Sequence, residues 1–331
     1  MHALTNPNAT AEAKALMAFL ESIEGKYILS AQHTKTVDPV ELRDIQALTG
    51  KLPAMAGFEL LGYSPNVNYE DTDEEAITEV MENCNTIDTA IEWAKKGGIV
   101  TYTYHWFSPL GGRNKSFYTE HTDFDLEKAM AGNCPEYAAI LRDLDLLADN
   151  LKRLRDLHIP VLWRPLHEAE GGWFWWGAKG AEPCKKLWRL MYDRFTRYHH
   201  LDNLIWVWNS PDPDWYPGDD CVDLISRDLY PEDDTASKKE FDELLAVSTN
   251  KMRAWAECGV QPNADRIFEE GANWLWTMNW CFGDVLSADA PAEGSTEAQK
   301  EWWHMLKPKL EARTRAFYAH PRVLCLGDCH F

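Results

Sequence analysis

The chain has 331 residues, of which 45% are apolar, so it can bury the core of a large α/β domain without a second unit. Lys and Arg number 33 against 53 Asp and Glu, and the resulting formal charge of -20 repels phosphate backbones and anionic membrane surfaces. The composition therefore predicts one domain over residues 1–331 and excludes nucleic acid and lipid membranes as expected partners.

Eight short β-rich runs, each bounded by turn residues, follow one another along the chain. They cover residues 27–33, 52–60, 98–106, 159–168, 203–210, 222–230, 251–259 and 273–280. Amphipathic helical stretches lie between them, with apolar stripes at Leu144, Leu147, Leu151 and Leu154 and at Leu187, Leu190, Met191 and Phe195. A strand followed by a helix, repeated in this way, predicts a parallel sheet closed into a (β/α)8 TIM barrel. An open doubly wound sheet is disfavoured because no Gly-rich turn follows the first run.

The last residues of these runs are mostly polar or aromatic. A barrel places its functional side chains at the C-terminal ends of its strands, so these positions are the candidates for a site. In chain order they are Gln32, His33, Glu59, His105, Trp106, His167, Glu168, Asn209, Asp228, Tyr230, Glu257 and the residues from Trp276 to Trp280. The long connection at residues 107–134 is rich in Gly, Asn and aromatic residues and is predicted to form a wall of a cleft.

The chain contains 16 Trp residues, an unusual number. Trp and Tyr can stack on the apolar face of a sugar ring while polar groups at the ring edge make hydrogen bonds. Any single Trp is more often part of the core than of a binding site. The Trp content is therefore compatible with a sugar-binding cleft lined by a minority of these rings.

Two glutamates at strand ends form the clearest catalytic candidate. Hydrolysis of a glycosidic bond needs one carboxylic acid to protonate the leaving oxygen and a second carboxylate on the other side of the sugar. Glu168 ends the fourth run and Glu257 ends the seventh, and strands three apart face each other across the mouth of a barrel. An isolated Glu is usually a solvated surface residue, so the catalytic interpretation depends on the two glutamates facing each other. Arg164, in the fourth run, either lowers the pKa of a neighbouring carboxyl group or forms a purely structural ion pair.

The segment around Glu168 reads WRPLHEAEGGWFWWG over residues 163–177. It resembles the acid/base signature of glycoside hydrolase family 26, a β-mannanase family of the large clan of retaining barrels. Other strands of that family resemble ILSAQH at residues 28–33, YHWFSP at 104–109, YPGDD at 216–220, DLY at 228–230 and WAECG at 255–259. The resemblance covers most of the chain and implies that Glu168 is the general acid/base and Glu257 the nucleophile.

The resemblance also implies roles for the residues around the two glutamates. Tyr230 would hydrogen-bond to Glu257 and orient it, and Trp173 would stack on the leaving-group side. His105 and His167 would bind the sugar under attack, and Trp280 would form the floor of its subsite. Trp106 and Trp276, at the ends of the same runs, are predicted to contact the substrate as well.

The sequence departs from the family pattern next to these positions. Ala169 and Glu170 follow the acid/base where the family often has other small or polar residues, and Cys281 follows Trp280 where some members carry a charged sugar-binding residue. Glu170 is expected to raise the pKa of Glu168 by like-charge repulsion, which suits an acid that must stay protonated near neutrality. Glu59 is a further candidate carboxylate, either supporting the site or binding sugar.

His105 and His167 also belong to a residue type that binds metals. No third His or carboxylate at ligand spacing accompanies them in the sequence, so we predict no metal and no other cofactor. The eight Cys contain no CxxC pair, which argues against a zinc ribbon and a thioredoxin-like site. Cys325 and Cys329 are close enough in sequence for a disulfide, which nothing in the sequence requires.

The expected reaction is a double displacement with retained configuration, which predicts carboxyl groups about 5–5.5 Å apart instead of the roughly 6.5–9.5 Å of an inverting enzyme. The resemblance implies internal cutting of β-1,4-mannan, galactomannan or glucomannan. Exo-acting release of mannobiose and activity on β-glucan or xylan are the alternatives within the family. A carbohydrate-binding barrel without catalysis and a metal-dependent barrel hydrolase are the alternatives outside it.

No apolar run is long enough to span a membrane, and residues 1–16 lack the basic start and apolar stretch of a signal peptide. A polysaccharide is too large to enter a cell, so the substrate implies a secreted or surface-bound enzyme. We therefore expect a monomer that acts outside the cell or at its surface, with a signal removed before Met1.

Overall fold

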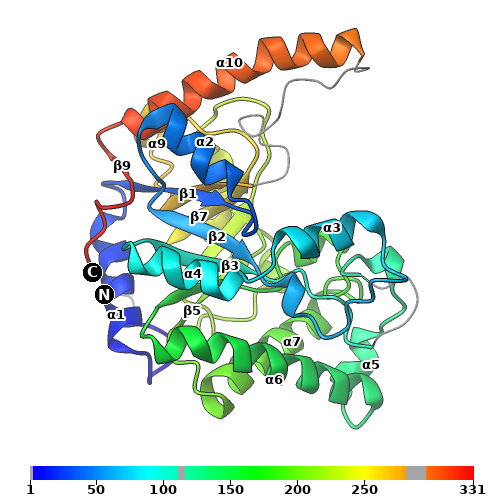
Figure 1. Ribbon diagram of the computed structural model, residues 1–331. Helices are drawn as coiled ribbons and strands as arrows, with labels where there is room; N and C mark the ends of the chain where they lie inside the picture. The colour runs from blue at the N-terminus through cyan, green and yellow to red at the C-terminus, as the bar shows by residue number, and fades with distance from the viewer. Residues whose placement is uncertain (1–2, 111–115, 281–295) are drawn as a thin grey trace.

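The computed structural model describes residues 3–110, 116–280 and 296–331. Its centre is a parallel sheet that closes into a barrel, because β1 pairs with both β2 and β8. The barrel strands are β1 (Ile28–His33), β2 (Met55–Glu59), β3 (Ile99–Thr103), β4 (Val161–Arg164), β5 (Leu204–Asn209), β6 (Leu224–Asp228), β7 (Arg253–Cys258) and β8 (Trp276–Asn279). Each lies within one of the eight predicted runs, so the predicted (β/α)8 TIM barrel is confirmed (Figure 1).

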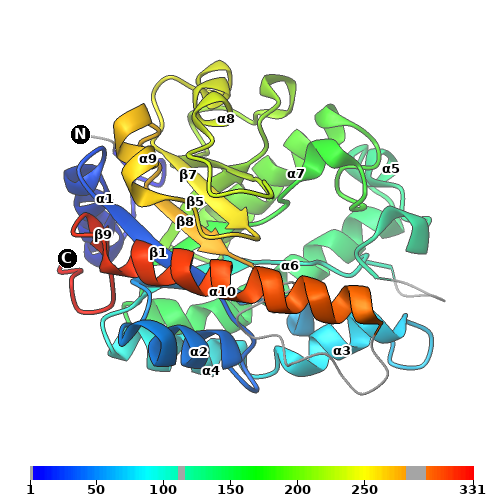
Figure 2. The same cartoon turned by 90° about the horizontal axis from the view of Figure 1, so that it is seen from above.

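Helices surround this barrel (Figures 1 and 2). They are α1 (Ala11–Ile23), α2 (Val40–Thr49), α3 (Glu74–Glu82), α4 (Thr86–Lys95), α5 (Leu126–Met130), α6 (Pro135–Asp156), α7 (Ala181–Asp193), α8 (Lys238–Glu243), α9 (Ala264–Glu270) and α10 (Glu297–Ala319). Helix α1 covers the end of the barrel at which the strands begin, and α10 runs beside α2 on the outside (Figure 1). Among the described helices, none combines the length and the apolar character needed to cross a membrane.

Two apolar layers hold the barrel together. Inside it, strand residues such as Leu29 and Leu162 pack against Leu16 and Leu20 of α1. Outside it, strand residues such as Trp163 pack against the helices, including the predicted stripe of α6, whose four leucines are all buried. Because both faces of each strand are covered, the runs are largely apolar and show little alternation with polar residues.

A ninth strand, β9 (Val323–Leu324), lies parallel to the beginning of β1 and was not predicted. Its register pairs Ile28 with Val323 and Leu29 with Leu324. A two-residue strand is too short for any periodic pattern, so only its tertiary neighbour defines it. Near it, Cys325 and Cys329 are both buried free thiols, so the disulfide that the sequence permits is not formed.

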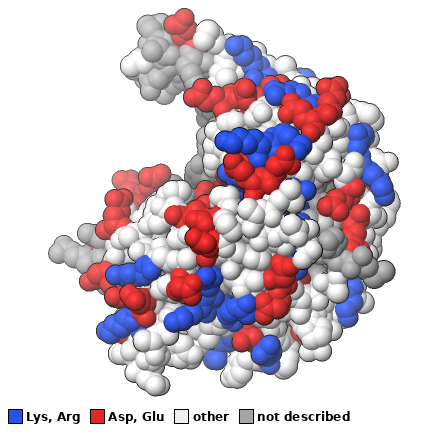
Figure 3. All heavy atoms as spheres, turned by 180° about the vertical axis from the view of Figure 1, so that it is seen from behind, with Lys and Arg blue, Asp and Glu red and all other residues white. Residues whose placement is uncertain are grey.

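All eight strands end on the same side of the molecule, and this side is hollowed. Figure 3 shows the hollow between the start of α10 and the part of the molecule that carries α3, with acidic side chains along its edge. Strand β4 stops at Arg164, four residues before the end of its predicted run. Pro165 has no N–H to continue the sheet, and both Leu166 (φ 54°) and Glu168 (φ 52°) adopt left-handed backbone conformations. The chain therefore leaves the sheet there and turns over the mouth of the barrel.

Candidate active site

Glu168 is held at the mouth by its backbone. Its N–H donates to the backbone oxygen of Asn209 at 3.2 Å and to the side-chain oxygen of the same residue at 3.1 Å. A left-handed conformation costs roughly 1–2 kcal/mol for a residue with a Cβ, and such strain is typically found where function demands one geometry. Asn209 ends β5, so the neighbouring strand fixes the position of this glutamate.

The turn after Glu168 brings an indole over it. The Nε1–H of Trp173 donates to the Glu168 carboxylate at 2.9 Å, and 48% of the Trp173 surface remains exposed. The turn needs glycine at two positions: a Cβ at Gly171 would overlap the Trp173 ring, and a Cβ at Gly177 would overlap the backbone oxygen of Ala169. The glycines of the WRPLHEAEGGWFWWG segment thus permit the close packing that places Trp173 against Glu168.

Glu257 is aimed into the mouth by an irregularity in the sheet. The pairing of β6 with β7 shifts register between Arg227 and Asp228, so that Asp228 lies opposite Glu257. The hydroxyl of Tyr230 donates to one oxygen of Glu257 at 2.7 Å, and the guanidinium of Arg164 donates to the other. The carboxylate therefore has both oxygens oriented, as the prediction for Tyr230 required.

Arg164 is a buried cation shared by two acids. It is 1% exposed and donates to Asp228 at 2.9 Å as well as to Glu257. Asp228 also accepts a hydrogen bond from the side chain of Asn209 at 2.9 Å. Since β4, β5, β6 and β7 each supply one member of this network, the closed sheet determines its geometry.

The two glutamates lie close together. One carboxylate oxygen of Glu168, one of Asp228 and one of Glu257 all fall within 4.8 Å of one another. Burial raises the pKa of Glu168 to about 7, and repulsion from Glu257 adds to the effect, while the Trp173 hydrogen bond opposes it. Burial also raises the pKa of Asp228 well above its usual value, but Asp228 is bound to Arg164 and Asn209. Glu168 is therefore the acid that can hold a proton near neutrality outside the Arg164 network.

The prediction that Glu170 raises the pKa of Glu168 is wrong. The raised pKa of Glu168 comes from burial and Glu257. Glu170 is directed away from Glu168, toward Ser210 and Arg227, and burial raises its own pKa. Adjacency along the chain did not translate into proximity because residues 169–171 form a tight helical turn.

His105, His167 and Trp280 meet on the opposite wall of the mouth. The His105 ring contacts His167 edge-on at 4.6 Å between centroids and Trp280 at 5.8 Å, and Trp280 stacks on His33 at 3.9 Å. Burial opposes the charged form of His105, but the Glu59 carboxylate beside it outweighs burial and raises the pKa of His105 to about 9. Burial and the neighbouring His105 hold the pKa of His167 well below its usual value. The wall thus presents one charged and one neutral imidazole.

Trp106 and Trp276 do not lie at this mouth, which corrects the prediction that they contact substrate. Trp106 is 0% exposed, packs on Trp175 outside the barrel and donates its indole N–H to Asp143 at 3.0 Å. Trp276 is 1% exposed and is the first residue of β8, so it belongs to the core inside the barrel, far from the end of that strand. The sequence placed both near strand ends. Trp106 cannot reach the mouth because it faces outward from the barrel, and Trp276 cannot reach it because it lies at the beginning of its strand.

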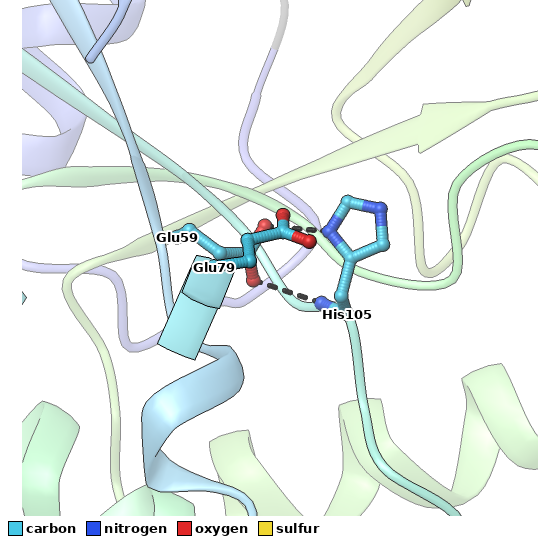
Figure 4. A group of neighbouring side chains, drawn as sticks. All are labelled: Glu59, Glu79 and His105. Atoms are coloured by element: carbon cyan, nitrogen blue, oxygen red, sulfur yellow. Dashed lines mark hydrogen bonds and ion pairs between the residues drawn. The ribbon is translucent and has the colours of Figure 1, made fainter. Parts of the chain in front are cut away.

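Glu59 and Glu79 lie beside each other next to His105 (Figure 4). The Nδ1 of His105 lies 2.7 Å from one oxygen of Glu59, and the backbone N–H of His105 donates to the other at 2.8 Å. Glu79 comes from α3, and one of its oxygens lies within 4.8 Å of ligand atoms of both other residues. Glu59 was a candidate supporting residue, whereas Glu79 was missed. Its only signal was an acidic helical stretch between the second and third strands.

Two groups of three side chains among the described residues have metal-ligand spacing: Glu168 with Asp228 and Glu257, and Glu59 with Glu79 and His105. In the first group, Arg164 already supplies positive charge to two of the acids. In the second, both oxygens of Glu59 accept hydrogen bonds from the protein. The absence of a metal remains a prediction. Cys281 and residues 111–115 of the predicted cleft wall lie outside the described residues.

Two close carboxyl groups lie at the ends of the fourth and seventh strands of this barrel, which is the arrangement that glycoside hydrolysis requires. The model of glycosyl hydrolase family 26 matches residues 5–300. The chain belongs to this family.

Several characterised proteins are similar to it. A mannan endo-1,4-beta-mannosidase of Thermothelomyces thermophilus is 43% identical over 297 residues, which cover 87% of this chain and 58% of the relative. The crystal structure of a Podospora anserina beta-(1,4)-mannanase has a TM-score of 0.84 and 38% identity, covering 99% of this chain and 69% of that one. A beta-mannanase from a symbiotic protist of the termite Reticulitermes speratus, complexed with gluco-manno-oligosaccharide, has a TM-score of 0.81 and 30% identity, covering 99% of this chain and 97% of that one.

The chain spans about half the length of the curated relatives it matches. The share is 58% for the Thermothelomyces relative and 48% for a mannan endo-1,4-beta-mannosidase B of a Piromyces species. The similarity therefore concerns the barrel described above, which is the part of those proteins that this chain matches.

Proposed function

We propose that this chain is a retaining glycoside hydrolase that cuts β-1,4-mannosidic linkages within mannan, galactomannan or glucomannan. The spacing of its carboxyl groups carries the proposal: oxygens of Glu168 and Glu257 lie within 4.8 Å. A retaining pair is about 5–5.5 Å apart, because one group attacks the sugar directly, whereas an inverting pair leaves room for a water. The short separation favours direct attack.

In the first step, Glu257 attacks the anomeric carbon and Glu168 protonates the departing glycosidic oxygen. Tyr230 and Arg164 both donate to Glu257, so they stabilise its anionic form and direct one oxygen toward the sugar. Glu168, with its pKa near 7, carries the proton that the leaving oxygen needs. The product of this step is a glycosyl ester on Glu257.

In the second step, Glu168 removes a proton from a water that attacks the same carbon and releases the sugar with its original configuration. The ionised form of Glu168 is accessible because the Trp173 hydrogen bond stabilises it. Formation of the ester in the first step neutralises Glu257 and so removes its charge repulsion on Glu168, which can then ionise and act as the base of the second step.

The remaining predicted residues supply the sugar contacts in this proposal. Trp173, half-exposed beside Glu168, offers a stacking surface for the leaving-group sugar. On the opposite wall, Trp280 and the two imidazoles of His105 and His167 surround the sugar under attack. The charged His105 is a hydrogen-bond donor and the neutral His167 can both donate and accept.

The names of similar proteins support mannan as the substrate and internal cutting as the mode, since the Thermothelomyces relative is a mannan endo-1,4-beta-mannosidase. Polysaccharide of this size does not cross a cell membrane, so the proposal includes action outside the cell or at its surface. One barrel domain over residues 1–331, working as a monomer, completes it.

Chemical rescue tests the catalytic assignment. Replacement of Glu257 by Ala should reduce turnover of mannan by a factor on the order of 10⁵, because no nucleophile remains. Azide should restore activity and yield a glycosyl azide of inverted configuration. The matched control is Glu269→Ala, an exposed helix residue away from the mouth. Undiminished activity of Glu257→Ala would remove this residue from the role.

A substrate panel tests specificity. Reducing-sugar release from locust bean gum should greatly exceed that from barley β-glucan and xylan, and excess chelator should leave it unchanged. Mannohexaose should yield products of several lengths early in the reaction. Mannobiose as the sole early product would indicate exo action, loss of activity in chelator a metal-dependent hydrolase, and binding without any cleavage a carbohydrate-binding barrel.

A further inference from the structure

A cavity of about 650 Å³ opens beside the wall formed by His105 and Trp280. It extends from these two residues to α3 and is lined by Glu74, Glu75, Thr78, Glu79, His105, Phe117, Tyr118 and Trp280. Neither Glu168 nor Trp173 lines it, and it adjoins the two side chains, His105 and Trp280, that are assigned to the sugar under attack. A polysaccharide that places one sugar under attack against Trp280 therefore has space for its preceding sugar here.

The aromatic part of this cavity suits a sugar ring. Phe117 is buried, Tyr118 is 38% exposed, and both reach the cavity from the loop after β3 that was predicted to form a cleft wall. Tyr118 stacks on Phe174 at 5.6 Å between centroids, so its ring has a fixed orientation. Rigid aromatic faces of this kind contact the apolar face of a sugar.

The polar part of the cavity contains an unusual carboxylate. Glu59, behind the wall, is saturated: it accepts from three backbone N–H groups and from Thr103 and lies 2.7 Å from His105 Nδ1. For Glu79, by contrast, no described residue donates a hydrogen bond to the carboxyl group, although that group is partly withdrawn from water and burial raises its pKa to about 7. A carboxylate in such a place is costly unless a ligand supplies donors.

Charge narrows the class of ligand. Glu74 and Glu75 are exposed at the same cavity, next to Glu79 on the first turns of α3. These acidic side chains repel uronic acids and other anionic sugars, whereas the hydroxyl groups of a neutral hexose can hydrogen-bond to Glu79 whether or not it is protonated.

We propose that Glu79 binds the hydroxyl groups of a neutral hexose, the residue that precedes the attacked sugar on its non-reducing side. This inference rests on the proposed function, because it assumes a chain of sugars running through the mouth. It assigns Glu79 to substrate specificity, and it assigns Glu59 to positioning His105 without contact with sugar.

Two aryl glycosides separate this role from the chemistry. The 2,4-dinitrophenyl β-mannoside reaches only the position under attack, whereas the corresponding β-mannobioside also fills the cavity. Glu79→Ala should lower kcat/KM for the mannobioside by about 10-fold to 100-fold, the effect of losing a hydrogen bond to a charged group, and leave the mannoside unchanged. Glu79→Gln, which keeps one acceptor oxygen, should lose less than Glu79→Ala.

Three results decide the matter. Equal losses on both substrates would assign Glu79 a structural role, and unchanged kinetics on both would leave the cavity unused; either overturns the inference. Wild-type protein that cleaves neither glycoside nor mannan would instead refute the proposed function itself. Glu269→Gln serves as the control, since this exposed glutamate of α9 lies far from the cavity. Thermal melts of all variants show whether any loss reflects unfolding.

Discussion

Two clusters at the mouth of the barrel each combine one basic side chain with two acidic ones, but they differ in how many of the acids the basic group binds. Arg164 donates to both Asp228 and Glu257, and His105 lies close to both Glu59 and Glu79. In the first cluster the cation bonds to both acids, so both are fixed. In the second it pairs with Glu59 alone, and Glu79 is left facing a cavity. A buried cation thus orients a nucleophile in one place and leaves a carboxylate available for ligand in the other.

The largest expected effect is on stability and comes from removing Arg164, the basic residue of the first cluster. Arg164→Ala removes a buried cation and leaves Asp228 and Glu257 uncompensated, so the free energy of unfolding should fall by about 3–5 kcal/mol. Urea unfolding measures it. Arg189→Ala is the control, because its ion pair with Asp220 is exposed and should contribute no more than about 1 kcal/mol. Similar losses for the two variants would mean that the Arg164 cluster does not differ from a surface pair.

In the second cluster, the contribution of the His105–Glu59 pair to the free energy of unfolding should depend on pH. The pKa of His105 rises from 6.5 to about 9, equivalent to about 3 kcal/mol, so its contribution is complete below pH 6.5 and is lost as the pH rises through 9. The pKa of Glu59 falls from 4.5 to about 2, because His105 outweighs burial, so its contribution is present above pH 4.5 and is lost toward pH 2. Wild type should therefore exceed Glu59→Gln most between pH 4.5 and 6.5.

Chemical denaturation at pH 5.5, 7.5 and 9.5 checks this window. The stability difference between wild type and Glu59→Gln should shrink steadily across the three values. Glu270→Gln, which breaks the exposed pair with Arg266, should show only a small difference throughout. A difference that stayed constant with pH would mean that the His105–Glu59 pair is held by packing alone.

A smaller effect concerns the pH profile of activity. Glu168 must be protonated to act as an acid, and protonation dominates below its pKa of about 7, so kcat/KM for mannan should fall about tenfold per pH unit above neutrality. For a substrate with a 2,4-dinitrophenyl leaving group, which departs without protonation, this alkaline limb should flatten. An identical limb for both substrates would assign it to another residue.

The smallest expected change is a shift in the pH profile of activity when Trp173 is replaced. Its hydrogen bond stabilises the ionised form of Glu168, so Trp173→Phe should raise the pKa of Glu168 and move the alkaline limb to higher pH by roughly half a unit to one unit. The pH dependence of kcat/KM measures the shift. Trp188→Phe is the matched control, because its indole donates to Cys221 in the core instead. A limb displaced to lower pH would reverse the assigned role of the indole.

The sequence allowed the barrel to be predicted because strand and helix patterns recur along it with little interruption. The eight runs contain the eight barrel strands, and Glu168 and Glu257 lie at the predicted mouth. Boundaries were less accurate where local chemistry overrode the pattern. Strand β4 ends at Arg164 because Pro165 follows it and two later residues adopt positive φ, a conformation that periodicity does not encode.

Other features could not be predicted from local sequence. Trp106 and Trp276 have the same residue type as Trp173, yet burial on particular faces of the sheet makes them core residues. Glu170 neighbours Glu168 along the chain, but the turn directs it elsewhere. Glu79 belongs to a helix between β2 and β3 and reaches His105 only through packing of that helix over the mouth.

The sequence by itself therefore determined the class of fold and the two acids at its mouth, because hydrophobic periodicity and strand ends are properties of the chain read locally. Tertiary structure alone decided which acids meet a cation, which tryptophans reach solvent and which carboxylate stays unpaired. These properties depend on distances between segments far apart in the chain, where burial and neighbouring charge set each group's protonation state.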